Sequence, residues 1–467
     1  MEQMLKLLKQ NSHLLMHING DIDTAQLFAE LYKDKLRYIP EAKSFYFYNG
    51  IVWQQDIEGM QAKRYAKEFV IAVLDYLVSN EATKDADIKY YSSFLSPKRR
   101  ISLIEDAKSV FPVSISEFDT SVTTFNCLNG TLKFGANKHC HRFTEHKPED
   151  MLSKVANVKY EPEARCERWE QFIFDIMQGK QELIDFLQMS AGYALTGLTD
   201  YECFFILYGS TTRNGKGTFC ETLLYLLGDY GRTAQAESIA CKSFSNGSAP
   251  NEDIARLRGA RFVNISEPAK DLYLNSALVK ALTGNDTICA RYLHQNSFEY
   301  KPQFKMFINT NHLPQVEDDS LFASGRVKLI PFERHFEATE QDTSLKAKFR
   351  QPEALSGILN WCLEGLDKLL KAGELKSPQV MAEAVEEYRA ESDTIKNFMQ
   401  DILIADTYQK VKTSLVYKAY GEWCRTNGFN ILNNRDFMKE LKRVATVKRN
   451  NTLGNMLIGY KLNKWYS

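Results

Sequence analysis

A buried strand, a glycine-containing loop and a helix follow one another in the sequence FFILYGSTTRNGKGTFCETLLYLLG, which begins at Phe204. This order predicts the phosphate-binding loop of a nucleotide triphosphatase. Backbone N–H groups must wrap the phosphates, so bulky side chains are excluded near Gly209 and Gly215, and the helix N-terminus adds its positive dipole end. We expect Lys216 to neutralise charge on the β/γ-phosphates and Thr218 to hold Mg²⁺ with its hydroxyl.

Two features of this loop depart from the usual pattern. Five residues rather than four separate Gly209 from Gly215, and Gly217 stands where a hydroxyl normally follows the lysine. Nucleotide kinases tolerate the same GKGT order, and the alternative is a plain turn between a strand and a helix. The residues expected to contact ATP are Gly209, Thr212, Asn214, Gly215, Lys216, Gly217 and Thr218.

Composition restricts the class of protein. The chain has 467 residues, which suggests roughly three domains, and 44% of them are hydrophobic, which is ample for cores. The 59 basic and 59 acidic residues balance, so any nucleic-acid surface must be local. No apolar run approaches the ~18 residues of a membrane helix. The nine cysteines contain no CxxC pair, which indicates a reducing, cytoplasmic setting.

Four blocks are expected along the chain. Residues 1–165 have mainly helical patterns and a probable hairpin with the turn Asn129-Gly130. Residues 166–345 alternate short apolar strands with helices, an α/β pattern. Residues 346–390 are predicted to form a helical linker, and residues 391–467 a tail of three helices and a terminal hairpin.

Two further strands of the α/β block end in polar side chains. ARFVNISEP ends in Glu267, which is the candidate general base and a second Mg²⁺ ligand, because the corresponding strand of such ATPases ends in an acid. FKMFINTNHLP ends in Asn309 and Asn311, and an amide there can orient the attacking water, although asparagine also favours turns. Arg326 precedes another short strand and could act as an arginine finger on a neighbouring subunit, or be an ordinary salt-bridged arginine.

These motifs, taken in order, resemble the superfamily 3 helicases, and in particular the phage, plasmid and poxvirus primase-helicase family. The resemblance rests on FNCLNGTLKF, GSTTRNGKGT, RLRGARFVNISEP, VKALTGNDTICARYL, FKMFINTNHLP and GRVKLIPF. It implies an AAA+-like P-loop ATPase core, a mainly helical collar-type N-terminal domain and a C-terminal winged-helix domain. By the same resemblance, Lys216 and Thr218 belong to Walker A, Glu267 to Walker B, Asn311 is the motif C sensor and Arg326 the finger.

The resemblance also implies a hexameric ring that translocates on single-stranded DNA, typically 3′ to 5′. Residues 282–303 correspond to the hairpin that grips DNA in the central channel, where the candidate DNA contacts are Lys280, Arg291 and His294. Basic and aromatic residues are interleaved there, as in single-strand channels. Half-exposed strands with the same mixture are nevertheless common.

The tail carries most of the local positive charge. Between residues 431 and 467, eight basic residues face only Asp436 and Glu440. Charge concentrated on a helix and a hairpin is typical of a DNA-backbone contact, and the alternative is a basic face that only docks on the ring. The candidate DNA contacts here are Arg435, Lys439, Lys442, Arg443, Lys448 and Arg449.

The sequence therefore predicts an ATP- and Mg²⁺-dependent DNA helicase that acts in replication initiation of a phage, plasmid or other mobile element. Its expected partners are single-stranded and duplex DNA, further copies of the chain and replication proteins. Two alternatives stay open: a P-loop nucleotide kinase, and a non-catalytic DNA-binding initiator with a degenerate ATP site. A primase polymerase activity is not expected, because Asp21-Ile22-Asp23 is equally explained as the start of a helix.

Overall fold

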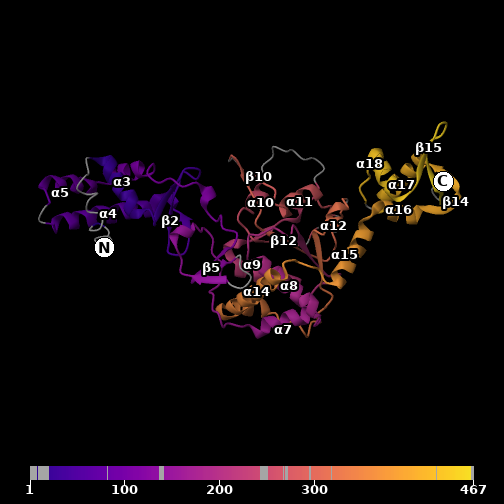
Figure 1. Cartoon of the computed structure of the whole chain (residues 1–467), viewed down its shortest axis with the longest axis horizontal. Coiled ribbons are helices and arrows are strands. Elements are labelled where there is room, and N and C mark those ends of the chain that lie inside the picture. The colour runs from indigo at the N-terminus through magenta and orange to yellow at the C-terminus, as the bar shows by residue number, and fades with distance from the viewer. Residues whose placement is uncertain are drawn as a thin grey trace.

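The computed structural model describes residues 8, 20–80, 83–135, 141–241, 251–266, 268, 272–293, 296–316, 318–427 and 429–463. The chain is drawn out along one axis, with an N-terminal unit at one end, an α/β core in the middle and a C-terminal unit at the other end (Figure 1). Among the described residues, no helix is both long and apolar enough to cross a membrane.

In the part that the structure describes, the N-terminal unit combines four α-helices with a small sheet. Its elements are α3 (Asp21–Tyr32), β1 (Leu36–Ile39), β2 (Ser44–Tyr48), β3 (Trp53–Gln55), α4 (Met60–Val78), α5 (Asp85–Ser92) and α6 (Pro97–Ala107). The prediction of a mainly helical unit missed this sheet. The segment SFYFY is rich in aromatic side chains, which favour strands, and it pairs antiparallel on both sides. Asp21 and Asp23 lie in the first turn of α3, as expected of helix-start residues.

A second antiparallel sheet follows, in the order β4 (Thr124–Cys127), β5 (Gly130–Phe134) and β6 (His141–Thr144). The predicted hairpin is confirmed, but its two-residue turn is Leu128-Asn129, one residue earlier than expected, because Cys127 pairs with Gly130. The Asn129 side chain holds this turn through two hydrogen bonds to the backbone of Tyr160. Phe125 and Leu132 pack into the core of the α/β region, not into that of α3–α6.

The α/β core is built on a five-stranded parallel sheet in the order β13-β7-β12-β9-β8. Its elements are α7 (Glu167–Ile176), α8 (Gln181–Tyr193), β7 (Phe204–Tyr208), α9 (Lys216–Leu227), β8 (Gly231–Ala234), α10 (Glu252–Ala255), β9 (Phe262–Ser266), α11 (Ser276–Thr283), β10 (Ile288–Arg291), β11 (Ser297–Tyr300), β12 (Lys305–Thr310), α12 (Ser320–Ala323) and β13 (Val327–Pro331). The α/β pattern predicted for this region is confirmed.

Both faces of the parallel sheet are covered. Phe205 and Leu207 pack with α7, α8, α9 and the later helix α14 (Pro352–Ala372) on one face. Phe204 and Ile206 pack with α11 and the β10–β11 hairpin on the other. Alternate side chains of a strand point to opposite faces, so a strand buried on both sides must be apolar throughout. This explains why FFILY is uniformly apolar.

Two buried cations join the start of this sheet to the segments around it. Arg261 precedes β9 and donates to the carbonyl oxygens of Ser121 and Thr124, while its guanidinium lies over the Tyr230 ring. Lys305 begins β12 and is 1% exposed. Its ammonium donates to main-chain carbonyls, among them Leu198 O at 3.1 Å, and lies 4.4 Å from the centre of the Tyr193 ring. Burial lowers the pKa of Lys305 well below its usual value.

Three helices lead from the core to the C-terminal unit: α13 (Leu345–Phe349), α14 (Pro352–Ala372) and α15 (Gln379–Ser392). The C-terminal unit contains α16 (Thr394–Ile402), β14 (Leu403–Lys412), α17 (Thr413–Asn427), α18 (Asn434–Val444), β15 (Val447–Asn450) and β16 (Gly454–Leu462). The three helices and the terminal hairpin were predicted. The strand β14 was not, and it completes an antiparallel sheet in the order β14-β16-β15.

Candidate functional site

The loop between β7 and α9 folds back at the carboxyl end of the parallel sheet. A Cβ on Gly209 would overlap the Asn214 side chain and lie 2.5 Å from the carbonyl oxygen of Phe332. Arg213 and Gly215 both have positive φ, +57° and +86°. These two residues flank Asn214, which points inward and is 3% exposed. The loop backbone is therefore tightly packed against the chain beneath it, as the two glycines predicted.

Lys216 is the first residue of α9 and is only 4% exposed. Its ammonium donates to the side-chain oxygens of Asn214, at 2.9 Å, and of Asn311, at 2.8 Å, and approaches Gly209 O at 3.4 Å. Asn311 directly follows β12, which is the neighbour of β7 in the sheet. The structure thus brings together two residues that the sequence analysis assigned to one site.

The ends of three parallel strands meet at this point. Asn309 pairs in register with Leu207 of β7 and with Ser266, the last residue of β9. Glu267, the predicted base, follows Ser266 directly and lies outside the described residues. Gly217 has open space around it, since a Cβ there would be 4.0 Å from the Asn309 amide nitrogen.

Two hollows flank the loop. One encloses about 220 Å³ and is lined by Thr218 and Gly215 together with Arg168, Arg213 and Gln341. The other encloses about 380 Å³ and is lined by Gly209 and Ser210, and by three carboxylates, Glu333, Glu387 and Glu391. Three carboxylates line the first hollow as well, namely Asp175, Glu340 and Asp342, but only the first hollow also has arginines, Arg168 and Arg213. An anionic ligand therefore favours the first hollow.

The segment after β13 forms part of the loop's surroundings, which the sequence analysis missed. His335 Nδ1 lies 2.9 Å from the carbonyl oxygen of Thr212, and the Phe336 N–H donates to Arg213 O at 3.0 Å. Only the parallel pairing of β13 with β7 places this segment beside the loop. The sequence PFERH contained no motif that could have indicated it.

Arg326 lies at the amino end of the parallel strands, whereas the loop lies at their carboxyl end. It precedes β13, whose first residue, Val327, pairs with Phe204 at the start of β7. The rise along β7, about 3.3 Å per residue, places this amino end about 16 Å from the loop. The guanidinium is largely buried, forms an ion pair with Glu202 and donates to Thr283 Oγ1 at 3.0 Å. Within its own subunit, Arg326 is therefore too distant to contact a ligand at Lys216.

The predicted hairpin between Glu267 and Asn311 is confirmed as β10–β11, with Arg291 opposite Ser297. His294 lies outside the described residues, whereas its sequence neighbour Leu293 is exposed. Lys280 lies on α11 and donates to Asp318 at 2.6 Å. Partial burial raises the pKa of Asp318, but hydrogen bonds from Lys280 and Ser320 outweigh it and lower the pKa to about 2.

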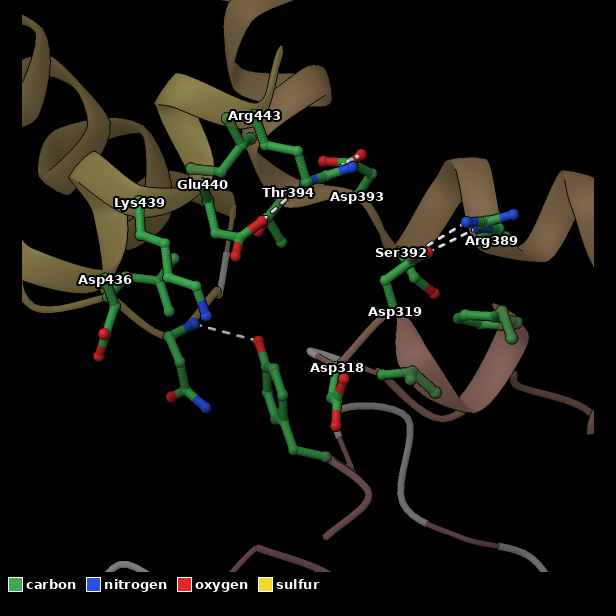
Figure 2. Close-up of a pocket in the computed structure, with 16 residues that line it drawn as sticks. Asp318, Asp319, Arg389, Ser392, Asp393, Thr394, Asp436, Lys439, Glu440 and Arg443 are labelled. Carbon is green, nitrogen blue, oxygen red and sulfur yellow. Dashed lines mark hydrogen bonds and ion pairs between the residues drawn. The ribbon is translucent and has the colours of Figure 1, made fainter. Parts of the chain in front are cut away.

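All four basic residues of α18 share one face of the helix by helical spacing, and two of them line a pocket. Lys439 and Arg443 line a pocket of about 360 Å³ between the core and the C-terminal unit, together with Asp318, Asp319 and Asp393 (Figure 2). Arg443 donates to Asp393 at 2.9 Å and to Glu440 at 2.8 Å.

On the core side of the same pocket, Arg389 forms a bidentate pair with Asp319, at 2.6 and 2.7 Å (Figure 2). By helical spacing, Arg435 and Lys442 lie on the same face of α18 as Lys439 and Arg443, and both are exposed, but neither lines this pocket. Lys448 and Arg449 are also exposed, on β15. The predicted DNA contacts of the tail thus divide into a solvent-facing set and a pocket-facing set.

Three family profiles match successive parts of the chain. The profile "D5 N terminal like" matches residues 25–178, a family of unknown function (DUF5906) matches residues 207–326, and "Poxvirus D5 protein-like" matches residues 390–464. The apo structure of the NrS-1 C-terminal region is similar with a TM-score of 0.48 at 10% identity, over 95% of this chain and 100% of that one.

Curated relatives are found in large DNA viruses. The chain is 30% identical over 308 residues to the putative helicase L207/L206 of Acanthamoeba polyphaga mimivirus. The aligned region covers 61% of this chain and 32% of that protein. It is 29% identical over 239 residues to the putative helicase 022R of Frog virus 3 (isolate Goorha), which covers 48% of this chain and 24% of that protein. The chain thus spans about a third or less of the length of these two relatives. These matches make the chain similar to poxvirus D5-like proteins and to putative helicases of large DNA viruses.

Proposed function

We propose that the chain is a superfamily 3 DNA helicase: an AAA+-like P-loop ATPase that forms a hexameric ring and translocates on single-stranded DNA. The observation that carries this proposal is the placement of the Lys216 ammonium, at the N-terminus of α9, on the Asn311 side chain from the end of the adjacent parallel strand. A lysine at a helix start beside a polar strand end is the arrangement that ATP-hydrolysing sites of this type require.

The residues of the loop suit a nucleoside triphosphate. The packed glycine backbone and the first N–H groups of α9 provide donors for phosphate oxygens, and Lys216 provides a positive charge beside them. Thr218, at the third position of α9, lines the hollow of about 220 Å³ that also contains Arg168 and Arg213. Mg²⁺, held by Thr218 and Glu267, would neutralise phosphate charge during transfer.

The residues of the site have separate proposed roles in hydrolysis. Lys216 holds the phosphates in place, while Glu267 accepts a proton from the attacking water. Asn311 contacts Lys216 and lies at the strand end where it can orient that water. Asn214, the second amide on the ammonium, keeps the lysine side chain directed along the loop.

Arg326 is proposed to complete the site of a neighbouring subunit. Its distance from the loop of its own subunit excludes a direct role there. Its position at the amino end of the strands, opposite the loop, suits a head-to-tail ring. In the single chain its guanidinium is held by Glu202, which keeps the side chain ordered. An arginine supplied in trans stabilises charge that develops in the transition state.

The C-terminal unit is proposed to be a winged-helix domain that binds duplex DNA. Its order of helix, strand, two helices and a hairpin suits that class, with α18 as the recognition helix and β15–β16 as the wing. The exposed Arg435, Lys442, Lys448 and Arg449 supply the phosphate contacts. The β10–β11 hairpin, with Lys280, Arg291 and His294, is proposed to contact the translocating single strand.

In this account the protein unwinds DNA in the cytoplasm during replication initiation of a phage, plasmid or other mobile element, together with replication proteins. The test is ATP turnover by the purified chain with and without DNA. Lys216→Ala should abolish turnover, whereas Lys180→Ala, which removes a surface lysine paired with Glu333, should not. Equal turnover by the Lys216→Ala variant and the unmodified protein would contradict the proposed ATP site.

A further inference from the structure

One side chain of the C-terminal unit is almost fully in solvent. Tyr408 is 93% exposed. It lies in a bulge of β14, because Ala405 pairs with Tyr460 and Lys410 pairs with Ile458, so that four residues of β14 face one residue of β16. That one residue is Gly459, whose φ of +86° suits glycine.

The bulge is held by specific contacts. Asp406 accepts a 3.2 Å hydrogen bond from the Tyr408 N–H and pairs with Lys461 at 3.0 Å. Bulges of this kind redirect a side chain and are conserved as designed features of a sheet. A single exposed aromatic ring would need no explanation, but the same sheet also carries a group of exposed cations.

Those cations are Lys410, Lys412 and Lys448. Val411, Leu457 and Val447 pack into the core of the C-terminal unit, so the alternation of side chains places these lysines on the opposite, solvent-facing side of the sheet. All three are exposed, and none forms an ion pair with a residue that the structure describes. We call Tyr408 and the three lysines the outer sheet face.

Met456 shows how two of the lysines lie. It pairs with Lys412 on one side and with Lys448 on the other, and it is only 8% exposed although it points away from the core. Lysine side chains on flanking strands can cover such a residue with their aliphatic stems while their ammonium groups stay in solvent. Strand spacing places the Cα atoms of Lys412 and Lys448 about 10 Å apart across β16.

We infer that the outer sheet face binds single-stranded nucleic acid, with Tyr408 stacking on a base and Lys410, Lys412 and Lys448 contacting phosphates. An aromatic ring on a sheet, flanked by unpaired cations, is the combination that single-strand binders use. Bases of a duplex are stacked on each other and offer no face to Tyr408. The face shares Lys448 with the proposed duplex contact, but Tyr408, Lys410 and Lys412 take no part in that contact, and so the inference goes beyond it.

The test is photo-crosslinking of the full chain to a short oligo-dT that contains iodouracil, without nucleotide, followed by mapping of the modified residue. A crosslink at Tyr408 is expected, because stacking brings the ring onto the halogenated base. Absence of any crosslink within residues 403–412, with crosslinks on the β10–β11 hairpin, would overturn the inference and leave the proposed helicase function intact.

Affinity gives a second measurement. Tyr408→Ala should weaken oligo-dT binding by about tenfold, and Tyr408→Phe should retain it, since stacking needs the ring and not the hydroxyl. Lys410→Ala with Lys412→Ala should also weaken it, whereas the exposed pair Lys371→Ala with Lys376→Ala should not. Equal loss of duplex binding in Tyr408→Ala, or competition by polyglutamate as strong as by oligo-dT, would show a surface for duplex or for acidic protein and would overturn the inference.

Discussion

The Lys216 ammonium donates a 2.8 Å hydrogen bond to the side-chain oxygen of Asn311, a residue 95 positions further along the chain. This contact joins the start of α9 to the end of β12. Of the two asparagines in FINTN, Asn311 is the one that contacts Lys216. Asn309 lies within β12 and has no hydrogen bond to Lys216 among those described.

The first prediction separates these two asparagines. Asn311→Ala should lower the rate of ATP hydrolysis by about a hundredfold, as the loss of a positioned polar group does in other active sites. ATP binding should be retained, because Asn214 still holds Lys216. Asn309→Ala is the matched control and should have a smaller effect. The measurements are steady-state turnover and nucleotide affinity of the two variants. An equal loss of turnover in Asn311→Ala and Asn309→Ala would contradict the role of Asn311.

The second prediction concerns Arg326. If it acts in trans, Arg326→Ala should lose about 10³-fold or more in turnover. A mixture of Arg326→Ala with Lys216→Ala should recover part of it, because a mixed interface pairs an intact loop with an intact arginine. Glu202→Gln breaks the same ion pair but keeps the arginine, so it should stay active. Mixed assemblies without recovered activity would show that Arg326 is only structural.

The third prediction divides the basic residues of the tail. Substituting Arg435 and Lys442 by alanine should weaken duplex binding and reduce its log–log salt slope by about 0.9 per lost phosphate contact. Arg443→Ala should change the slope less, because Asp393 and Glu440 already neutralise that arginine. Titrations of duplex DNA at several salt concentrations measure both, and the reverse ranking would place the DNA against the pocket-lining residues of α18.

The sequence predicted the α/β core well because its strands carry their own signal. A strand buried on both faces must be apolar along its whole length, as in FFILY, and polar side chains follow β9 and β12 at their carboxyl ends. The strand β14, LIADTYQKVK, has no such signal, since most of its residues are exposed. It forms only because β16 offers a partner edge, which no local pattern reveals.

The candidate site was predictable in its motif residues and not in its surroundings. Lys216 and Asn311 follow from strand ends, but the approach of His335 to the loop depends on the parallel pairing of β13 with β7. Likewise, Lys439 and Arg443 resemble the other tail cations in sequence. Their position in the interdomain pocket depends on the tertiary fold, which brings α15 and α18 to line the same pocket.

The fourth prediction follows from the buried Lys305, whose pKa burial lowers. In the unfolded chain this lysine keeps its proton up to its usual range, about pH 10. Between the lowered native pKa and about pH 10, the unfolded state therefore binds more protons than the native state. The free energy of unfolding rises with pH in that window. Relative to Lys305→Met, the unmodified protein should therefore gain up to about 1.4 kcal/mol per pH unit above the native pKa.

Chemical denaturation between about pH 7 and about pH 9 measures this difference. Lys346→Met is the control, because Lys346 is half-exposed and pairs with Glu221 at the surface. The control should show a flat difference from the unmodified protein over the same range. A flat difference for Lys305→Met as well would mean that the buried ammonium keeps its ordinary pKa.

The most direct test of the whole account is strand displacement on forked DNA with ATP, using substrates that carry either a 3′ or a 5′ single-stranded tail. The account predicts that the unmodified protein displaces the strand only with a hydrolysable nucleotide and favours the 3′ tail. Glu267→Gln should bind the fork and ATP without displacing it. Displacement that proceeds equally without ATP, or in Lys216→Ala, would contradict a helicase driven from this loop.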